Sequence, residues 1–324
     1  MRRSIVLSLF VSLSLWSAPA RALDFTYATI NFPGASTTLV GGISEAGLMV
    51  GNYTDSSGSY GFVTNDGVNF TTVNLPNGSP PGYGFGFADI NDNGQMVGSY
   101  QPPSLVTNSE KGFVATEGSY STLAFPGSRE TRAQSINDAG QIVGIYEKST
   151  GTYGFYTANG TSFQSMSAFG STFTRAIGIN NAGEIVGSFS DATGGHGFLT
   201  SDRINYIAFN VPGGTTTWAT GINGSGQIIG DFSDGTGGLR GFFTSDRITY
   251  DILMVPDSFS THLLGIDNHG NIVGQYLDST GYHGFIASPV PLPAALPLFG
   301  TGLGLVYLTS KVSRAFAKRK QETI

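Results

Sequence analysis

Residues 179–187 read Ile-Asn-Asn-Ala-Gly-Glu-Ile-Val-Gly, and this stretch decides the fold. The same pattern begins at Ile43, Ile90, Ile136, Ile179, Ile222 and Ile266, so that successive Ile anchors are 47, 46, 43, 43 and 44 residues apart. A Gly-Phe pair follows each copy, at residues 61–62, 112–113, 154–155, 197–198, 241–242 and 284–285. Two markers in phase over six copies indicate an internal repeat.

Each copy has the pattern of four short strands. In the fifth, residues 217–222, 227–233, 240–244 and 248–255 are rich in Ile, Val, Phe, Tyr and Thr, which suit a pleated surface. The intervening Asn-Gly-Ser-Gly at 223–226 is typical of a tight hairpin turn. Four strands in about 40–45 residues are typical of a β-propeller blade. The alternative is a β-solenoid, whose coils are usually shorter.

The two ends of the repeat region favour a ring. The last copy stops after its third strand, at residues 285–287, whereas residues 25–35 at the other end match the fourth strand at 206–213. An N-terminal strand that completes the last blade would close the ring and remove an open edge. We therefore predict an all-β fold, a six-bladed β-propeller of four-stranded blades over residues 23–288, closed by the strand at 23–33.

The repeats also resemble those of the HAF-repeat proteins, which are extracellular. Their His-Ala-Phe triplet appears as His196-Gly197-Phe198 and His283-Gly284-Phe285, and the other four units begin it with Tyr60, Lys111, Tyr153 and Arg240. The resemblance covers most of residues 30–288. It implies a surface or matrix protein and assigns no reaction.

Residues 1–22 have the pattern of a secretory signal peptide. Arg2 and Arg3 precede an apolar stretch, and Ala20-Arg21-Ala22 is a small-x-small site, so we expect cleavage after Ala22. The alternative is an N-terminal membrane anchor, for which the apolar stretch is short.

The C-terminal segment, residues 289–324, carries a second targeting signal. Residues 290–308 are almost wholly apolar and long enough for a transmembrane helix, and the basic residues after them favour a cytoplasmic end. The alternative is an apolar helix packed on the domain. The motif before the span is Val290, Pro291, Leu292, Pro293 and Ala294.

Motif, span and basic tail together resemble the PEP-CTERM sorting signal in its VPLPA variant. The resemblance implies an exosortase-type processing enzyme as partner, in a Gram-negative bacterium that makes exopolysaccharide. It also implies a precursor anchored in the inner membrane and a body then released or attached at the cell surface.

Composition excludes several functional classes. The chain has 16 basic and 22 acidic residues, and residues 23–288 keep eight and 21 of them, which disfavours nucleic acid as a partner. The absence of cysteine excludes disulfides and Cys-ligated zinc, and the four histidines lack metal-ligand spacing, so we predict no metal or cofactor. Calcium binding is an alternative at four loops that begin with an aspartate, Asp55, Asp191, Asp234 and Asp278. An Asx-turn would account for an aspartate at these positions equally well.

A ligand site is predicted at one mouth of the ring. The residue four positions before each Ile anchor varies, and in the third to sixth units it is Arg132, Arg175, Trp218 and His262. Guanidinium groups pair with carboxylates and an indole stacks on a sugar ring, so we expect an anionic or hydroxyl-rich ligand. The alternative is that these are ordinary solvated side chains.

No Gly-x-Ser-x-Gly elbow, phosphate-binding loop or dinucleotide fingerprint is present. The sequence therefore predicts no catalytic residue and a protein that is not an enzyme, exported to the cell surface or matrix to bind polysaccharide or another surface protein. One alternative is an extracellular polysaccharide-acting enzyme, a glycosidase or lyase. Three carboxylates that break the repeat are its candidates, Asp89, Glu130 and Glu184. The other alternative is a purely structural spacer.

Overall fold

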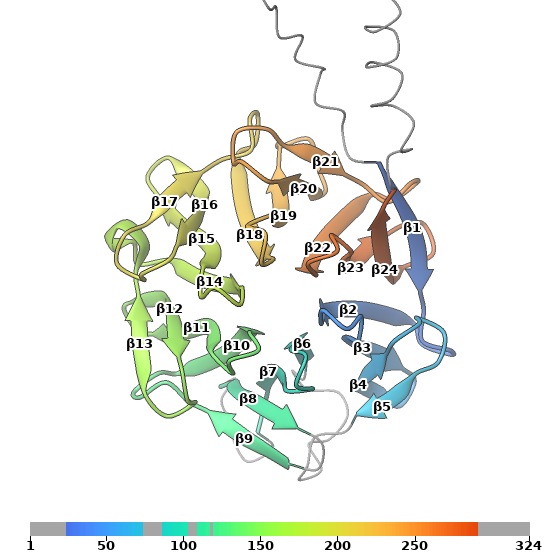
Figure 1. Cartoon of the computed structure of the whole chain (residues 1–324), viewed down its shortest axis with the longest axis horizontal. Coiled ribbons are helices and arrows are strands. Elements are labelled where there is room, and N and C mark those ends of the chain that lie inside the picture. The colour runs from blue at the N-terminus through green and yellow to red at the C-terminus, as the bar shows by residue number, and fades with distance from the viewer. Residues whose placement is uncertain (1–23, 74–85, 103–108, 117–118, 291–324) are drawn as a thin grey trace, which may run out of the picture.

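The computed structural model describes residues 24–73, 86–102, 109–116 and 119–290. Each of the six sequence units folds into a four-stranded antiparallel meander, and the meanders surround a common axis with their first strands innermost (Figure 1). Unit 1 contains β2 (Thr37–Ile43), β3 (Met49–Asp55), β4 (Gly58–Thr64) and β5 (Thr71–Val73). Unit 2 contains β6 (Gly86–Ile90), β7 (Met96–Tyr100), β8 (Lys111–Thr116) and β9 (Ser119–Leu123). Unit 3 contains β10 (Glu130–Ile136), β11 (Ile142–Lys148), β12 (Gly151–Thr157) and β13 (Phe163–Met166).

The second half of the ring repeats this order. Unit 4 contains β14 (Thr174–Ile179), β15 (Ile185–Asp191), β16 (Gly194–Thr200) and β17 (Ile207–Phe209). Unit 5 contains β18 (Thr216–Ile222), β19 (Ile228–Ser233), β20 (Arg240–Thr244) and β21 (Asp251–Leu253). Unit 6 contains β22 (Ser260–Ile266), β23 (Ile272–Leu277), β24 (Tyr282–Pro289) and, from the other end of the chain, β1 (Phe25–Ile30).

Hydrogen bonding groups these strands into five sheets. Units 1, 2, 3 and 6 are separate four-stranded sheets, whereas units 4 and 5 form one eight-stranded sheet, because β16 and β18 share a parallel pair at Gly195 and Thr216. The prediction of six separate four-stranded blades is therefore wrong: four blades are separate and the other eight strands are continuous. The fold is all-β and propeller-like.

Helical structure is minor in the described ranges, where η1 (Ala168–Gly170) is a single 3-10 turn. No helix there is long and apolar enough to cross a membrane. The predicted signal peptide, residues 291–294 of the sorting motif and the predicted span lie outside the described residues.

The predicted closing strand is confirmed. β1 pairs antiparallel with β24, in a register that runs from Phe25 opposite Pro289 to Ile30 opposite Gly284. The backbone N–H of Val290 also donates to the carbonyl of Asp24, at 2.8 Å. The outer edge of β24 is thereby covered, as the edge of a sheet must be if it is not to pair with another molecule.

Both repeat markers have a packing cause. In every unit the first strand bulges just before its Ile anchor. The Val-Gly glycine of the second strand lies against a backbone carbonyl of the first strand in all six units. A Cβ on Gly187, the Val-Gly glycine of unit 4, would collide with the carbonyl oxygen of Arg175 and lie 2.9 Å from the ring of Phe198. The Gly-Phe rings are fully buried in all six units, at Phe62, Phe113, Phe155, Phe198, Phe242 and Phe285.

The turn asparagine joins neighbouring units. The Oδ1 of Asn180 accepts the N–H groups of Ala182 and Glu184 in its own turn, while its Nδ2 donates to the carbonyl of Asn223 in the next unit, at 3.0 Å. The same link to the next unit is made by Asn91, Asn137 and Asn223. One side chain therefore both closes a hairpin and ties two units together.

Each His-Gly-Phe histidine hydrogen-bonds to two segments of its own unit. In unit 4, Nδ1 of His196 lies 2.9 Å from Oδ1 of Asn210, and its Nε2 lies 2.9 Å from the hydroxyl of Thr193. In unit 6, His283 contacts Asn31 and Thr280 in the same way. Each histidine thus ties the loop between the second and third strands to the end of the fourth.

Candidate functional site

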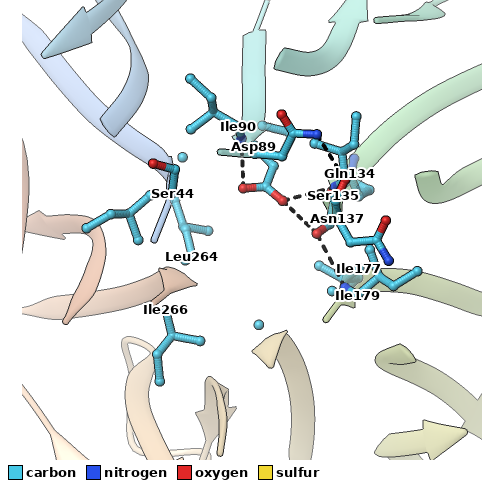
Figure 2. A pocket seen from close by; sticks show the side chains of 18 of the residues that line it. Ser44, Asp89, Ile90, Gln134, Ser135, Asn137, Ile177, Ile179, Leu264 and Ile266 are labelled. Atoms are coloured by element: carbon cyan, nitrogen blue, oxygen red, sulfur yellow. Dashed lines mark hydrogen bonds between the residues drawn. The ribbon is translucent and has the colours of Figure 1, made fainter. Parts of the chain in front are cut away.

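A cavity of about 320 Å³ runs along the axis and is lined by the first strands of all six units (Figure 2). The residue just before the Ile anchor lines this cavity in units 2 to 6. It is glycine in units 1, 4, 5 and 6, at Gly42, Gly178, Gly221 and Gly265. Units 2 and 3 have Asp89 and Ser135 instead. These two polar residues therefore make one side of the channel chemically different from the rest.

Asp89 and Ser135 are bonded to one another across two units. The Ser135 hydroxyl donates to Oδ2 of Asp89 at 2.6 Å, and the same oxygen accepts the N–H of Ile136 at 3.1 Å. Its Oδ1 accepts the N–H of Ile90 at 2.8 Å (Figure 2). Burial deep in the ring raises the pKa of Asp89 to about 6, although these hydrogen bonds act in the opposite direction.

The other two candidate carboxylates lie in different surroundings. Glu130 forms ion pairs with Arg129 and Arg132. The Oε2 of Glu184 accepts a hydrogen bond from Asn180 in its own turn, at 2.8 Å. No hydrogen bond or shared partner links Glu130, Glu184 and Asp89 within the described part of the chain. The structure therefore does not assemble them into a carboxylate pair.

The predicted ligand residues do occupy one level of the ring. Arg132, Arg175, Trp218 and His262 hold the equivalent register position on β10, β14, β18 and β22, which follow one another around the axis (Figure 1). The axial cavity reaches this level beside the equivalent residues of units 1 and 2, Leu39 and Gly86. We call Arg175, Trp218, His262 and its partner Asp231 the mouth site.

Arg132 is left out of the mouth site because its guanidinium is already engaged. It forms ion pairs with Glu110 and Glu130, and its Nη1 lies 3.6 Å from Oε1 of Glu147. Three carboxylates around one guanidinium leave few N–H groups for a ligand.

Arg175 is in the opposite situation. No hydrogen bond or ion pair to it is found among the described residues, although it is only partly exposed. Burial lowers the pKa of Arg175, the nearby charge of Arg132 lowers it further, and Glu147 acts against both. All five N–H groups of this guanidinium are therefore without a protein acceptor in that part of the chain.

His262 is held by a carboxylate that is not among the residues predicted from the sequence, Asp231. Its Nδ1 lies 3.2 Å from Oδ2 of Asp231, which is 4% exposed and whose Oδ1 accepts the N–H of Leu263 at 3.0 Å. The hydrogen bond to Asp231 raises the pKa of His262 against the effect of burial, and burial raises the pKa of Asp231. The Nε2 of His262 has no partner among the described residues, so it is free to give or take a proton.

A signal for Asp231 does exist in the repeats. It directly follows the Val-Gly or Ile-Gly pair, where the six units have Asn52, Ser99, Ile145, Ser188, Asp231 and Gln275. In unit 1, Asn52 bonds both the N–H and the carbonyl of Phe87 in the next unit, at 2.8 and 2.9 Å. Asp231 accepts the equivalent backbone N–H, that of Leu263, and also contacts the ionisable ring of His262. It is the single acidic residue among these six.

The four loops considered for calcium are closed by their own hydrogen bonds. Each Asp carboxylate accepts bonds from the backbone N–H and hydroxyl of the Ser or Thr two residues later, in the pairs Asp55–Ser57, Asp191–Thr193, Asp234–Thr236 and Asp278–Thr280. These are the hydrogen bonds of an Asx-turn. Within the described ranges, no group of three or more His, Asp or Glu residues is placed to hold a metal ion.

Comparison with known proteins adds likenesses in structure alone. No family model and no curated protein matches the sequence. A gluconolactonase from Xanthomonas campestris superposes with a TM-score of 0.50 at 12% identity, over 84% of this chain and 98% of that one. TolB from Acinetobacter baumannii gives 0.51 at 8% identity, over 75% and 64%. A Trypanosoma rangeli sialidase gives 0.47 at 12% identity, over 82% and 56%, so this chain spans about half of its length.

The likenesses to gluconolactonase and TolB show a propeller-like fold. They also correct the expectation that this protein is not an enzyme, because the gluconolactonase is an enzyme on the same kind of scaffold and the fold alone does not exclude catalysis. That expectation came from the absence of short catalytic motifs. In a ring of repeats, functional side chains come from several strands far apart in sequence, so they form no short motif.

Proposed function

We propose that this protein is an extracellular enzyme that acts on polysaccharide, with His262 as the group that transfers a proton at the mouth site. One observation carries this proposal. A buried carboxylate, Asp231, holds one ring nitrogen of His262 and leaves the other unpartnered on a partly exposed imidazole. A histidine oriented in this way is a suitable general acid or base.

The neighbouring side chains suit a sugar polymer. Trp218 holds the equivalent position on the adjacent inner strand, and an indole face stacks on the apolar face of a pyranose ring. Asp231 acts as a positioning residue, because it fixes the ring tautomer and stabilises the protonated imidazole. The scaffold that presents these residues is the propeller-like ring of six sequence units, in which units 4 and 5 are joined by a single parallel pair.

The test is a comparison of three variants on a panel of bacterial polysaccharides, with the release of new chain ends as the readout. His262→Gln should lower kcat by about a hundredfold or more, which is the usual contribution of a general acid or base. His269→Gln is the control, since that side chain is 73% exposed and belongs to a turn rather than to the mouth site. Equal activity of both variants would contradict the proposal, and loss of activity in Asp89→Asn alone would place the chemistry in the channel.

Asp231→Asn separates positioning from catalysis through the pH profile. Because Asp231 raises the pKa of His262, a reaction that needs neutral His262 should speed up as the pH rises through a value above 6.5. Without the carboxylate this rise should move to lower pH, and the maximal rate should fall. Asp231 is the ionisable side chain in contact with His262 among the described residues.

We also propose that the precursor is exported and then processed at its C-terminal segment by an exosortase-type enzyme. The pairing of β1 with β24 is compatible with this, because residues 24 and 290, which border the two predicted targeting segments in the sequence, lie side by side. Deletion of residues 290–324 should convert a membrane-held precursor into a freely released protein. An unchanged distribution between membrane and medium would overturn this part.

A further inference from the structure

Of the three arginines around the mouth site, two have carboxylate partners and the third, Arg175, has none among the described residues. Arg129 and Arg132 share the carboxylates of Glu110, Glu130 and Glu147 through ion pairs. Arg175 adds the third positive charge of this group, so these six side chains sum to zero formal charge, and Asp231 beside His262 is the further acidic side chain of the mouth site. Arg175 is also the member for which the described part of the chain supplies no hydrogen-bond acceptor.

A partly buried guanidinium without an acceptor is costly, because it has lost water without gaining a partner. A carboxylate restores the balance best, since its two oxygens match two parallel N–H groups of the guanidinium. Trp218 and His262 hold the same register position on the next two inner strands, so a sugar bound to Arg175 through its carboxylate would lie beside the strands that carry the indole and the free Nε2.

We infer that the substrate is a uronate-containing polysaccharide and that the reaction is β-elimination rather than hydrolysis, an inference that rests on the proposed role of His262. Pairing with Arg175 neutralises the uronate carboxylate and so acidifies the proton on the carbon beside it. Nε2 of His262 takes this proton. The electron pair of the broken C–H bond forms a C=C bond to the next ring carbon, and the glycosidic C–O bond of that carbon breaks. The departing oxygen takes a proton from the imidazolium, which returns His262 to its neutral form.

Two readouts test the substrate class and the chemistry separately. Trp218 is the one tryptophan among the described residues, so its fluorescence reports occupancy of the mouth site. Oligosaccharides of guluronate, mannuronate, galacturonate and glucuronate are titrated against neutral glucan oligosaccharides, and ultraviolet absorbance of the conjugated C=C–carboxylate product reports elimination. We expect a response to at least one oligouronate and none to the neutral sugars.

The variants give a sharp comparison. Arg175→Gln should weaken oligouronate binding by about tenfold to a hundredfold, with partial recovery in Arg175→Lys. The control is Arg247→Gln, because that arginine lies in the turn after β20, at the opposite end of its unit from Trp218. His262→Gln should keep binding and lose the unsaturated product.

The outcomes are distinguishable. Oligouronate binding that depends on Arg175 but gives no unsaturated product would retain the substrate class and overturn the elimination. If the products are those of hydrolysis and their formation is lost in His262→Gln, the proposed function stands and the elimination is overturned. Equal response to neutral and acidic sugars, or the same affinity in Arg175→Gln, would overturn the assignment of a uronate.

Discussion

At the scale of single residues, the repeat is defined by a few positions at which packing or hydrogen bonding strongly favours one type of residue. The Val-Gly glycine has no room for a Cβ, the Gly-Phe ring fills the interior of its unit, and the turn asparagine bonds in two directions. Because the glycine and phenylalanine contacts recur in six units and the asparagine link in four, their residues stand out in the sequence without any structure. Asp231 and Ser135 do not recur, so the sequence offers them only as deviations whose partners belong to another unit.

The glycine contact makes a direct prediction. Gly187→Ala should destabilise the protein by about 2–4 kcal/mol, in the range of a core residue that is overpacked, because the new methyl group meets the carbonyl of Arg175. Gly195→Ala in the next strand is the matched control, since its Cβ would lie 3.4 Å from Thr216, an ordinary contact. Urea unfolding of both variants measures the difference. Similar midpoints would show that unit 4 relaxes around the added atom.

At the scale of elements, the ring depends on one strand from the far end of the chain. The pairing of β1 with β24 was predictable, because residues 25–35 resemble the fourth strand of another unit. The fusion of units 4 and 5 was not predictable, since it depends on one backbone pair between Gly195 and Thr216. Backbone contacts of this kind carry no side-chain signature. The mouth site falls between these cases: its level in the ring follows from the repeat spacing, but its hydrogen bonds do not.

Removal of the closing strand should leave the edge of β24 open. A chain that starts at residue 33 should therefore unfold at lower urea concentration and form oligomers through this edge, whereas one that starts at residue 24 should remain as stable as the longer protein. Size-exclusion chromatography coupled to light scattering measures the oligomers. A monomeric, equally stable short form would show that β1 is dispensable for closing the ring.

At the scale of the whole molecule, stability should depend on pH in an unusual direction. Asp89 has a folded pKa of about 6 against an ordinary value of 3.8, so between these two pH values the folded state binds more protons than the unfolded state. The free energy of unfolding therefore falls as the pH rises from about 4 to 6. On the acid side, the pKa is lowered to about 2 for Asp66, Asp191, Asp202 and Asp246, so stability is also lost as the pH falls from about 4 towards 2.

The expected result is a maximum of stability near pH 4 to 5, with a loss from Asp89 of about 2–3 kcal/mol by pH 7. The slope of the unfolding free energy against pH between 4 and 6 reports the number of protons released on unfolding. Asp89→Asn should reduce that number by about one, whatever its effect on absolute stability. Chemical denaturation at a series of pH values measures this slope. An unchanged slope would show that Asp89 titrates normally in the folded ring.

The pairing of β1 with β24 also determines at what stage of folding the ring can close. Thr26 bonds to Ser288, 262 residues further along, so a polypeptide still being synthesised or threaded through a membrane pore contains a first strand with nothing to dock on. Closure over so long a separation is slow compared with forming each local hairpin. The ring should therefore stay open until its final strand is available, which would leave the chain loose enough for the export proposed above.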